Sequence, residues 1–372
     1  MRFAFRHSIS CLRLDQNSLI LIPKIDGLSG DTAVKSFASD NYSPIAPEIL
    51  QAIISANQDH QPSYGNDIYT QQAEELLRET FGYHIKSFFA YNGTAANVAG
   101  LKAILKSYHA IICSDLAHII VHEVNAATNM TGCPTLLIPN HDGKITADEI
   151  QTCYDDATYW GHHANLPKVV SITQSTEVGT VYTRDELLEI SAVCKKNKLI
   201  FHMDGCRLSN AAAALNCSLS EITTDAGVDV LSFGGTKNGL MLGEAIIFFK
   251  PALADEFAYI HKQSLQLNSK MRFLSAQFIP YLKDELWHRY ASHANRMAKL
   301  LGDGLSKIKG VTINYPVQTN QVFAVVPEKL IQATIEIYPY YIRDKKISQI
   351  RLVTSFDTTE EEINHFVELA SK

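Results

Sequence analysis

The sequence predicts an α/β protein in which helices cover both faces of a mostly parallel sheet, with a smaller α+β domain at the C-terminal end. Three observations lead to this class. Short apolar runs alternate with helical stretches between residues 87 and 249, as in βαβ units. The 372 residues exceed what one hydrophobic core usually organises. After Tyr281 the alternation gives way to a long helical segment followed by strands.

Each element follows from its local pattern. A loop with Pro44 and Pro47 precedes a helix expected over residues 48–56, and apolar residues recur at helical spacing over residues 70–81. Strands are expected at 87–91, 110–114, 135–138, 169–173, 199–203 and 245–249, with helices at 95–106, from 118 onward and at 184–197. The C-terminal part should hold a helix at 282–305, strands at 311–315, 322–326 and 349–355, and a helix at 359–370. The predicted units are an N-terminal extension (1–34), a large domain (35–285) and a small domain (286–372).

The composition argues against several classes of protein. The net charge of −6 leaves no basic surface for nucleic acid, and no apolar run approaches the roughly 20 residues that span a bilayer. The seven cysteines are scattered and form no C-x-x-C motif, which argues against a disulfide scaffold or a zinc site and for a reducing compartment. We therefore expect a soluble, cytoplasmic protein without a bound metal.

The first fourteen residues carry Arg2, Arg6, His7 and Arg13 and no acidic residue. A transit peptide has this kind of composition, but no apolar segment with a small-residue cleavage site follows it. An extension of the folded part is the expectation for this segment.

The stretch from His202 to Gly239 carries the strongest functional pattern. Apolar, strand-like runs lead into Asp204 and into the GGTKNG segment that holds Lys237, 33 positions farther on. Pyridoxal phosphate (PLP) needs a lysine that forms an imine with it and an acid that keeps its ring nitrogen protonated. Asp204 would lie where ligands of α/β proteins bind, and Arg207 would reach the ring oxygen. Taken singly, these residues have ordinary structural alternatives: a core acid, a surface lysine and a salt-bridge partner.

Two loops suit the phosphate end of such a cofactor. Glycines beside Lys237 allow a loop to approach a ligand closely, and Thr236 is placed to donate its hydroxyl to the phosphate. Gly93 and Thr94 stand between a predicted strand and a predicted helix, where N–H groups and a hydroxyl form an anion cradle. A glycine-rich surface turn is the alternative at Lys237.

Further candidates are histidines, an acid and an arginine. His118 follows another predicted strand and would stack on the cofactor ring, although a lone histidine is commonly structural. His122 and Glu123 are candidates for acid–base work. Arg351 lies on a predicted strand of the small domain, where its guanidinium would pair with a substrate carboxylate or remain a sheet-surface charge.

These motifs together resemble the low-specificity threonine aldolases, which belong to the aspartate-aminotransferase-like group of PLP enzymes. HMDGCRLSNA and SFGGTKNG carry the resemblance, and FASDNYS, GNDIYT, NGTAAN, DLAH, QSTEVGTV and IRLVTSFD follow the family's order from residue 36 to the C-terminus. The resemblance implies PLP fold type I, with a seven-stranded, mostly parallel sheet and a small α+β domain. It also implies a lyase that cleaves L-threonine, L-allo-threonine and related L-β-hydroxy-α-amino acids to glycine and an aldehyde.

The resemblance assigns roles to individual residues. It implies Lys237 as the Schiff-base lysine, Asp204 on the pyridine nitrogen, Arg207 on the ring oxygen, Gly93 and Thr94 on the phosphate, His118 on the ring face, and Ser39 and Arg351 on the substrate carboxylate. Family members are typically homotetramers with shared active sites, so Tyr69, Lys270 and Arg272 are candidates for residues lent by a neighbouring subunit.

Two departures from the family pattern stand out. Cys206 replaces the usual alanine of the DGAR motif, a mild change in size. Glu177 stands where many members have a histidine near the β-hydroxyl, so the preference between threonine and allo-threonine is open. The base for the β-hydroxyl proton is Glu177, His118, His122 or a water molecule.

Two other functions share much of this pattern. A β-eliminating lyase or a racemase of the same fold would keep Asp204 and Lys237 and break a different bond. A cofactor-carrying binding protein without turnover would also keep these residues, but the sequence shows no additional interaction module.

Overall fold

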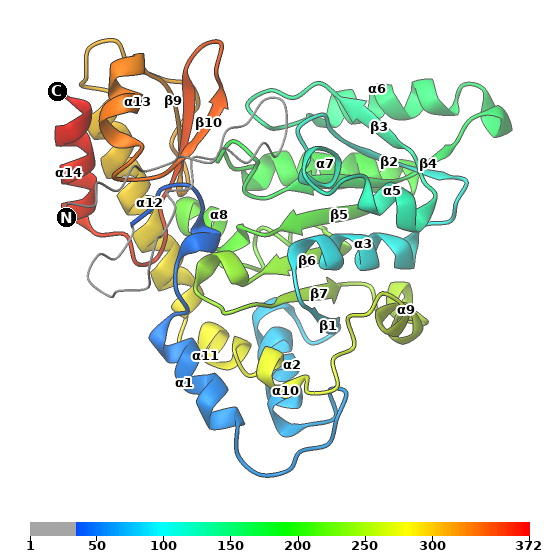
Figure 1. Ribbon diagram of the computed structural model, residues 1–372. Helices are drawn as coiled ribbons and strands as arrows, with labels where there is room; N and C mark the ends of the chain where they lie inside the picture. Colours follow the sequence, from blue (N-terminus) through cyan, green and yellow to red (C-terminus); the bar gives the residue numbers. More distant parts are fainter. Residues whose placement is uncertain (1–34) are drawn as a thin grey trace, which may run out of the picture.

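The computed structural model describes residues 35–372, and Figure 1 shows a large sheet with a smaller sheet at the C-terminal end. The large sheet consists of β1 (Lys86–Ala90), β2 (His109–Ser114), β3 (Thr135–Ile138), β4 (Leu166–Thr173), β5 (Ile200–Gly205), β6 (Val230–Gly234) and β7 (Glu244–Phe248). Its strand order is β1-β7-β6-β5-β4-β2-β3, and β7 runs antiparallel to both of its neighbours. The predicted seven-stranded, mostly parallel sheet is confirmed.

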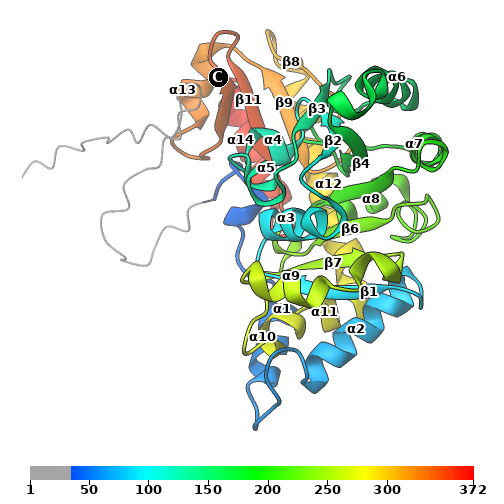
Figure 2. The ribbon, with the colours of Figure 1, turned by 90° about the vertical axis from the view of Figure 1, so that its right-hand side faces the viewer.

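Helices cover both faces of this sheet, as Figure 2 shows with α3 on one side and α7 and α8 on the other. The helices of the large unit are α1 (Pro47–Ala56), α2 (Ile68–Phe81), α3 (Gly93–Ile104), α4 (His118–Val121), α5 (Ala126–Thr131), α6 (Ala147–Thr158), α7 (Arg184–Asn197), α8 (Leu208–Leu215), α9 (Phe257–Gln263), α10 (Arg272–Ser275) and α11 (Phe278–Lys283). Short 3-10 turns are η1 (Asp40–Tyr42), η2 (Gly161–His163), η3 (Thr236–Asn238) and η4 (Pro251–Ala254).

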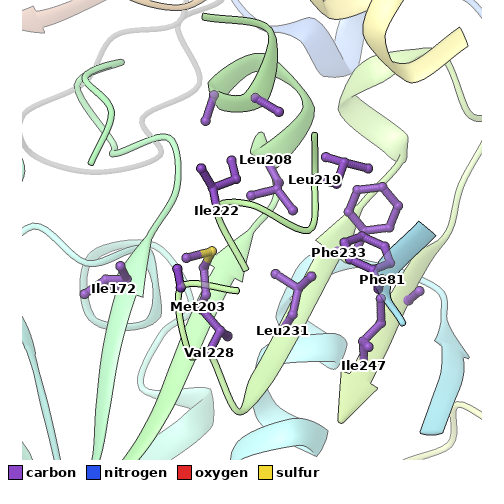
Figure 3. Close-up of a cluster of buried hydrophobic side chains, with 14 of the residues drawn as sticks. Phe81, Ile172, Met203, Leu208, Leu219, Ile222, Val228, Leu231, Phe233 and Ile247 are labelled. Carbon is purple, nitrogen blue, oxygen red and sulfur yellow. The ribbon is translucent and has the colours of Figure 1, made fainter. Parts of the chain in front are cut away.

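The hydrophobic core is divided between the two faces because neighbouring strand residues point in opposite directions. Met203, Leu231 and Phe233 face α8 and the loop after it, and Figure 3 shows this cluster reaching Phe81 of α2. Val230, the neighbour of Leu231, instead packs in the core under α3 and α9. Near-continuous apolar strands of this kind are expected for a sheet buried on both faces.

Local signals fix several helix boundaries. The Asp67 carboxylate accepts a hydrogen bond of 2.8 Å from the Thr70 amide and caps α2. Thr183 and Glu186 form a capping box that fixes the start of α7, and the bounds of this helix are the predicted 184–197. Within α2 the buried residues Ala73, Leu77 and Phe81 recur every four positions, which explains the helical period in the sequence.

The smaller unit is an antiparallel sheet backed by helices. It consists of α12 (Leu286–Leu305), β8 (Thr312–Ile313), β9 (Gln321–Val325), α13 (Glu328–Thr334), β10 (Tyr341–Asp344), β11 (Gln349–Val353) and α14 (Glu360–Ala370), with the strand order β10-β11-β9-β8. Phe37 packs into its core, stacked on Tyr338, and the Val353 amide donates to the Phe37 carbonyl. The segment before α1 therefore lies against β11.

The predicted continuous helix over residues 282–305 is wrong. Glu285 has a left-handed backbone, with φ of 50°, so α11 ends at Lys283 and α12 begins at Leu286 with a new direction. Tyr281 and Leu282 pack in the core of the large unit, whereas Leu301 and Leu305 pack in that of the small one. The apolar residues between 281 and 305 therefore pack into two separate cores, which a single straight helix would not allow.

Within residues 35–372, no helix combines the length and apolar character that a membrane span requires. The predicted extension 1–34 lies outside the described residues. The proposed domain boundary at residue 285 falls in the turn between α11 and α12 and stays a prediction.

Candidate active site

A cavity of about 410 Å³ lies where the carboxyl ends of the central strands face the small sheet. Seven of the predicted candidates line it: Ser39, His118, His122, Glu177, Arg207, Lys237 and Arg351. Five of these follow β2, β4, β5 and β6, whose carboxyl ends share one edge of the sheet. The strand alternation read from the sequence is therefore what brings these side chains together.

Asp204 lies at the end of β5 and is almost fully buried. The Asn97 side chain donates a hydrogen bond of 2.8 Å to Asp204 Oδ2, and the Cys206 amide donates one of 3.0 Å to Oδ1. Burial opposes the charge of Asp204, but His118, Asn97 and Lys237 outweigh it and hold the pKa of the carboxyl below its ordinary value. The structure thus presents an ionised acid within 4.8 Å of His118, which lines the cavity.

Lys237 follows β6 on the short turn η3. The turn needs glycine at two positions: a Cβ on Gly234 would lie 2.4 Å from the Cys206 carbonyl oxygen, and Gly239 has a φ of +102°. The buried Glu244 of β7 accepts a hydrogen bond of 2.9 Å from the Gly235 amide. Burial raises the pKa of Glu244 to about 7, so a titratable group lies directly under this loop.

His118 is held by two glutamates. Its Nδ1 lies 3.0 Å from Glu123 Oε1, and its backbone amide donates a hydrogen bond of 2.8 Å to Glu177 Oε1. The Asn97 amide group donates to both Glu123 Oε1 and Asp204 Oδ2, so these hydrogen bonds explain why His118, Glu123 and Asp204 lie within 4.8 Å of one another. Because a carboxylate oxygen only accepts, Nδ1 of His118 carries the proton of this hydrogen bond.

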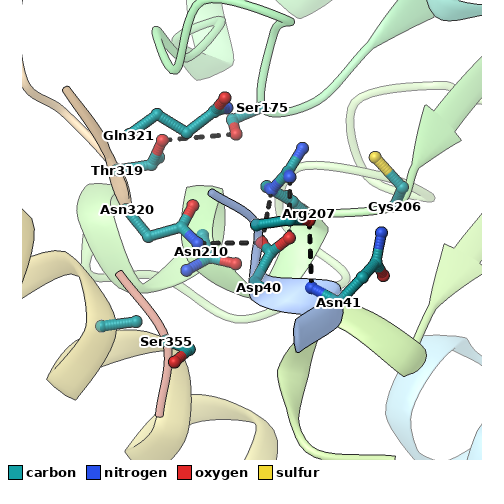
Figure 4. Close-up of polar contacts among 12 residues, drawn as sticks. Asp40, Asn41, Ser175, Cys206, Arg207, Asn210, Thr319, Asn320, Gln321 and Ser355 are labelled. Atoms are coloured by element: carbon teal, nitrogen blue, oxygen red, sulfur yellow. Dashed lines mark hydrogen bonds and ion pairs between the residues drawn. The ribbon is translucent and has the colours of Figure 1, made fainter. Parts of the chain in front are cut away.

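Arg207 forms the most buried ion pair of the site. Its Nε and Nη2 donate hydrogen bonds of 2.7 and 2.9 Å to the two carboxylate oxygens of Asp40, as Figure 4 shows. The Asn320 side chain donates a further bond of 3.0 Å to Asp40 and ties the pair to the small sheet. The guanidinium beside it holds the pKa of Asp40 below its ordinary value although burial opposes this charge.

Glu177 is half-buried at the edge of the cavity. The Thr173 hydroxyl donates a hydrogen bond of 2.6 Å to Glu177 Oε1, the same oxygen that accepts from the His118 amide. Burial raises the pKa of this carboxyl despite both bonds. Oε2 has no hydrogen bond to any residue of the described chain, so it is the oxygen open to a ligand.

Arg351 reaches the cavity from β11 of the small sheet. Its Nε and Nη2 donate hydrogen bonds of 3.0 and 2.9 Å to the amide oxygen of Gln321, a neutral partner. Burial, and then the nearby positive charge of Arg207, lowers the pKa of Arg351 to about 10. Ser39 lies beside it as the N-cap of η1, where its hydroxyl accepts a hydrogen bond of 3.1 Å from the Asn41 amide.

Known proteins share this architecture. Residues 36–329 match the family described as Beta-eliminating lyase. The chain is 47% identical over 300 residues to the low specificity L-threonine aldolase of Pseudomonas aeruginosa, which covers 80% of this chain and 86% of that one. It is 24% identical over 299 residues to the low specificity L-threonine aldolase of Saccharomyces cerevisiae, with 78% and 74% covered.

This chain belongs to the beta-eliminating lyase family. Among solved structures, the threonine aldolase of Leishmania major superimposes with a TM-score of 0.86 at 31% identity, covering 90% of this lyase and 98% of that chain. The aspartate aminotransferase of Thermus thermophilus shares the fold, with a TM-score of 0.66 at 13% identity and 91% of each chain covered. The predicted fold class, and the predicted resemblance to threonine aldolases, are confirmed.

The residues of this lyase fit PLP, the cofactor that the family implies. The N–H groups of Gly93 and Thr94 open α3, where they precede the first intrahelical hydrogen bonds, and the Asn92 side chain caps the turn. A Cβ on Gly93 would meet no atom within 4 Å, so this turn is open to a ligand. Each oxygen of Asp204 can accept one bond beyond those from Asn97 and Cys206, which suits a protonated ring nitrogen.

Three predicted residues of the lyase have other partners within the chain. The Thr236 hydroxyl accepts a hydrogen bond of 3.0 Å from the Gly243 amide and bonds the Glu244 carboxyl, so its phosphate contact stays a prediction. The Tyr69 hydroxyl donates a hydrogen bond of 3.0 Å to the Ser55 carbonyl, away from the residues that line the cavity. Arg272 bonds the carbonyl of Asp59, also outside the cavity. Roles for Tyr69, Lys270 and Arg272 across a subunit boundary stay predictions.

Sequence reasoning missed four polar residues of the site. All four are buried: Asp40, Asn97, Glu244 and Gln321. Their hydrogen-bond partners are, in that order, Arg207, Asp204, the loop that holds Lys237, and Arg351. The FASDNYS motif contained Asp40 and the NGTAAN motif contained Asn97, but neither had a local pattern that pointed to its partner.

Proposed function

We propose that this lyase uses PLP to cleave L-threonine, L-allo-threonine and related L-β-hydroxy-α-amino acids to glycine and an aldehyde. With threonine the aldehyde is acetaldehyde. The observation that carries the proposal is that Lys237 and Arg351 line one cavity, while the ionised Asp204 lies within 4.8 Å of His118, which also lines it. The cavity thus combines an amine, an acid for a cationic ring and a guanidinium for a carboxylate.

Each of these groups has a place in holding the cofactor. Gly93 and Thr94 would hold the phosphate, Asp204 the ring nitrogen, and Lys237 the aldehyde carbon, with His118 beside the ring. When bound, PLP supplies an electron sink for the pair left on Cα after the Cα–Cβ bond breaks. Arg207 keeps one guanidinium nitrogen, Nη1, outside its pair with Asp40, and this is the donor for the ring oxygen.

We assign substrate binding and proton transfer to Arg351 and Glu177, which also line the cavity. Arg351 would pair with the α-carboxylate, and this contact orients Cα and Cβ. We assign the β-hydroxyl proton to Glu177, because its Oε2 has no partner in residues 35–372 and its raised pKa favours proton uptake. His122 is a weaker base, since burial and then the nearby His118 and Arg343 lower its pKa to about 4. His118 and a water molecule are the other candidates.

Product analysis tests this reaction directly. The purified holoenzyme should form glycine and acetaldehyde in equal amounts from L-threonine and from L-allo-threonine, and the Lys237→Ala variant should form neither. Ammonia and a keto acid from serine or cysteine, without glycine from threonine, would instead indicate a β-eliminating lyase. Epimerised threonine without an aldehyde would indicate a racemase.

The wider setting of the reaction also belongs to the proposal. We place the lyase in the cytoplasm, in threonine catabolism and glycine formation, as a homotetramer with active sites shared between subunits. The chain similarity to threonine aldolases supports the amino-acid substrate. Mass measurement of the native holoenzyme tests the tetramer, and a monomer with full activity would contradict the sharing of sites.

A further inference from the structure

A second arginine of the small sheet points into the same cavity. The pairing of β10 with β11 runs Tyr341–Arg351, Ile342–Ile350 and then Asp344–Gln349, so Arg343 is an extra residue in a β-bulge. Bulges commonly re-aim a side chain beside an active site. Arg343 lines the cavity next to Arg351 although its side chain is exposed to solvent, so it lies at the mouth.

The contacts of Arg343 cross from the small unit to the large one. Its Nη1 lies 3.3 Å from Nε2 of His122, the residue that ends α4. Burial, and then nearby cations, lower the pKa of His122 to about 4, so the ring is neutral at physiological pH and its Nε2 can accept a hydrogen bond. A neutral ring does not balance the charge of Arg343. Arg343 therefore has an acceptor but no counter-ion at this position.

The acids that line or underlie the cavity have other partners. Asp40 accepts both bonds from Arg207, Asp204 bonds Asn97 and Cys206, and Glu177 bonds Thr173 and His118. Across residues 35–372, neither Arg343 nor Arg351 forms an ion pair with a carboxylate. Threonine carries one carboxylate, which leaves one of the two guanidinium groups without an anion.

We propose that Arg343 binds a second carboxylate on the substrate, so that the lyase accepts β-hydroxy-α-amino dicarboxylic acids, of which 3-hydroxyaspartate is the smallest. This inference rests on the proposed function, because it assigns the α-carboxylate to Arg351. The second carboxylate is carried by Cβ, beyond the bond that breaks, and Arg343 lies two positions along β10 from the residue that pairs with Arg351. Planar guanidinium groups suit such paired carboxylate recognition.

The reaction balances without an added reactant. The Cα–Cβ bond of 3-hydroxyaspartate breaks, its β-hydroxyl oxygen becomes an aldehyde oxygen and the hydroxyl proton leaves to the base. Cα keeps the electron pair of the broken bond and receives a proton. The products are glycine and glyoxylate, which together hold every atom of the substrate.

Kinetics with two substrates and matched variants test the inference. The wild-type holoenzyme and the variants Arg343→Met, Arg343→Lys and Lys345→Met are assayed with L-threonine and with both L-3-hydroxyaspartate diastereomers. Loss of a charge-assisted contact to one substrate should lower the ratio of kcat/KM for 3-hydroxyaspartate to that for threonine about tenfold or more in Arg343→Met, chiefly through KM. Arg343→Lys should lose less, and Lys345→Met, an exposed neighbour outside the cavity, should keep the wild-type ratio.

The outcomes separate the inference from the function on which it rests. Glyoxylate from the wild type, with the selective loss in Arg343→Met, supports the inference. Equal losses on both substrates would overturn it, because Arg343 would then serve the α-carboxylate or hold the two units together. Cleavage of threonine without cleavage of 3-hydroxyaspartate would overturn the inference and leave the proposed function in place, whereas no glycine from either substrate would refute the proposed function itself.

Discussion

Two arginines reach the same cavity from opposite sides and have different partners. Arg207, after β5, gives two hydrogen bonds to the carboxylate of Asp40 and is almost fully buried. Arg351, on β11, gives two hydrogen bonds to the neutral amide oxygen of Gln321. The charge of Arg207 is therefore balanced within the chain, while that of Arg351 remains for a ligand.

The same contrast holds for the wider surroundings. We define the floor as His118 and Arg207, which line the cavity, together with the buried Asn97, Glu123 and Asp204, which His118 joins through Glu123. We define the rim as Arg343 and Arg351. Floor residues bond one another or Asp40 and hold their positions without a ligand. Rim residues bond neutral acceptors. We propose from this difference that the floor holds the cofactor, whereas the rim selects the substrate by its anionic groups.

Replacing Lys237, which lines the cavity from η3, should have the largest effect. The Lys237→Ala variant removes the amine that bonds the cofactor, and we expect a loss of kcat of about a thousandfold or more. Absorbance spectroscopy measures the loss of the visible band of the lysine-bound cofactor, and glycine release measures the loss of kcat. Lys345→Ala is the control for loss of a lysine. A Lys237→Ala variant that keeps both the visible band and turnover would contradict the role of Lys237.

The ion pair of Arg207 should matter greatly for stability. Asp40→Asn leaves a buried guanidinium without its counter-charge, and we expect a loss of about 3 to 5 kcal/mol in the free energy of unfolding. Asp255→Asn breaks the exposed pair with Lys86 and should cost less than about 1 kcal/mol. Urea unfolding measures both values. Equal, small losses would show that the charge of Arg207 needs no partner within the chain, which would remove the contrast with Arg351.

Glu123 should act on catalysis through His118. Glu123→Gln removes the carboxylate that holds His118 Nδ1, and we expect kcat to fall about a hundredfold with a shifted pH–rate profile and little loss of cofactor. The exposed Glu79→Gln serves as the control. Unchanged kcat together with an unchanged pH profile would reduce Glu123 to a packing residue.

A buried histidine beneath the floor should make stability depend on pH. His202 of β5 lies 2.9 Å from the Ser171 hydroxyl, and burial lowers its pKa from 6.5 to about 4. Below pH 6.5 the unfolded chain therefore binds a proton that the folded chain does not, so stability falls as the pH drops toward 4. Between about pH 7 and pH 5 this residue should remove about 2 kcal/mol. His202→Gln should lack this part of the pH dependence in urea unfolding, and the exposed His84→Gln should retain it.

Much of this site could be predicted from the sequence because strands carry it. Lys237 and Asp204 each end an apolar run, and parallel strands bring such ends to one edge. The ion pair of Arg207 with Asp40 joins residues 167 positions apart, and no local pattern encodes it. The bulge at Arg343 depends on how β10 pairs with β11, and the break at Glu285 depends on two cores that compete for one apolar run.

The division between floor and rim is tested most directly by one variant, Arg351→Met, studied by absorbance and by kinetics with L-threonine. Because Arg351 is not among the residues proposed to hold the cofactor, the variant should bind PLP and keep the wild-type visible absorbance band. Because Arg351 is the proposed partner of the substrate carboxylate, the KM of the variant for L-threonine should rise about tenfold or more. A variant that loses the cofactor, or one that keeps the wild-type KM, would contradict the division.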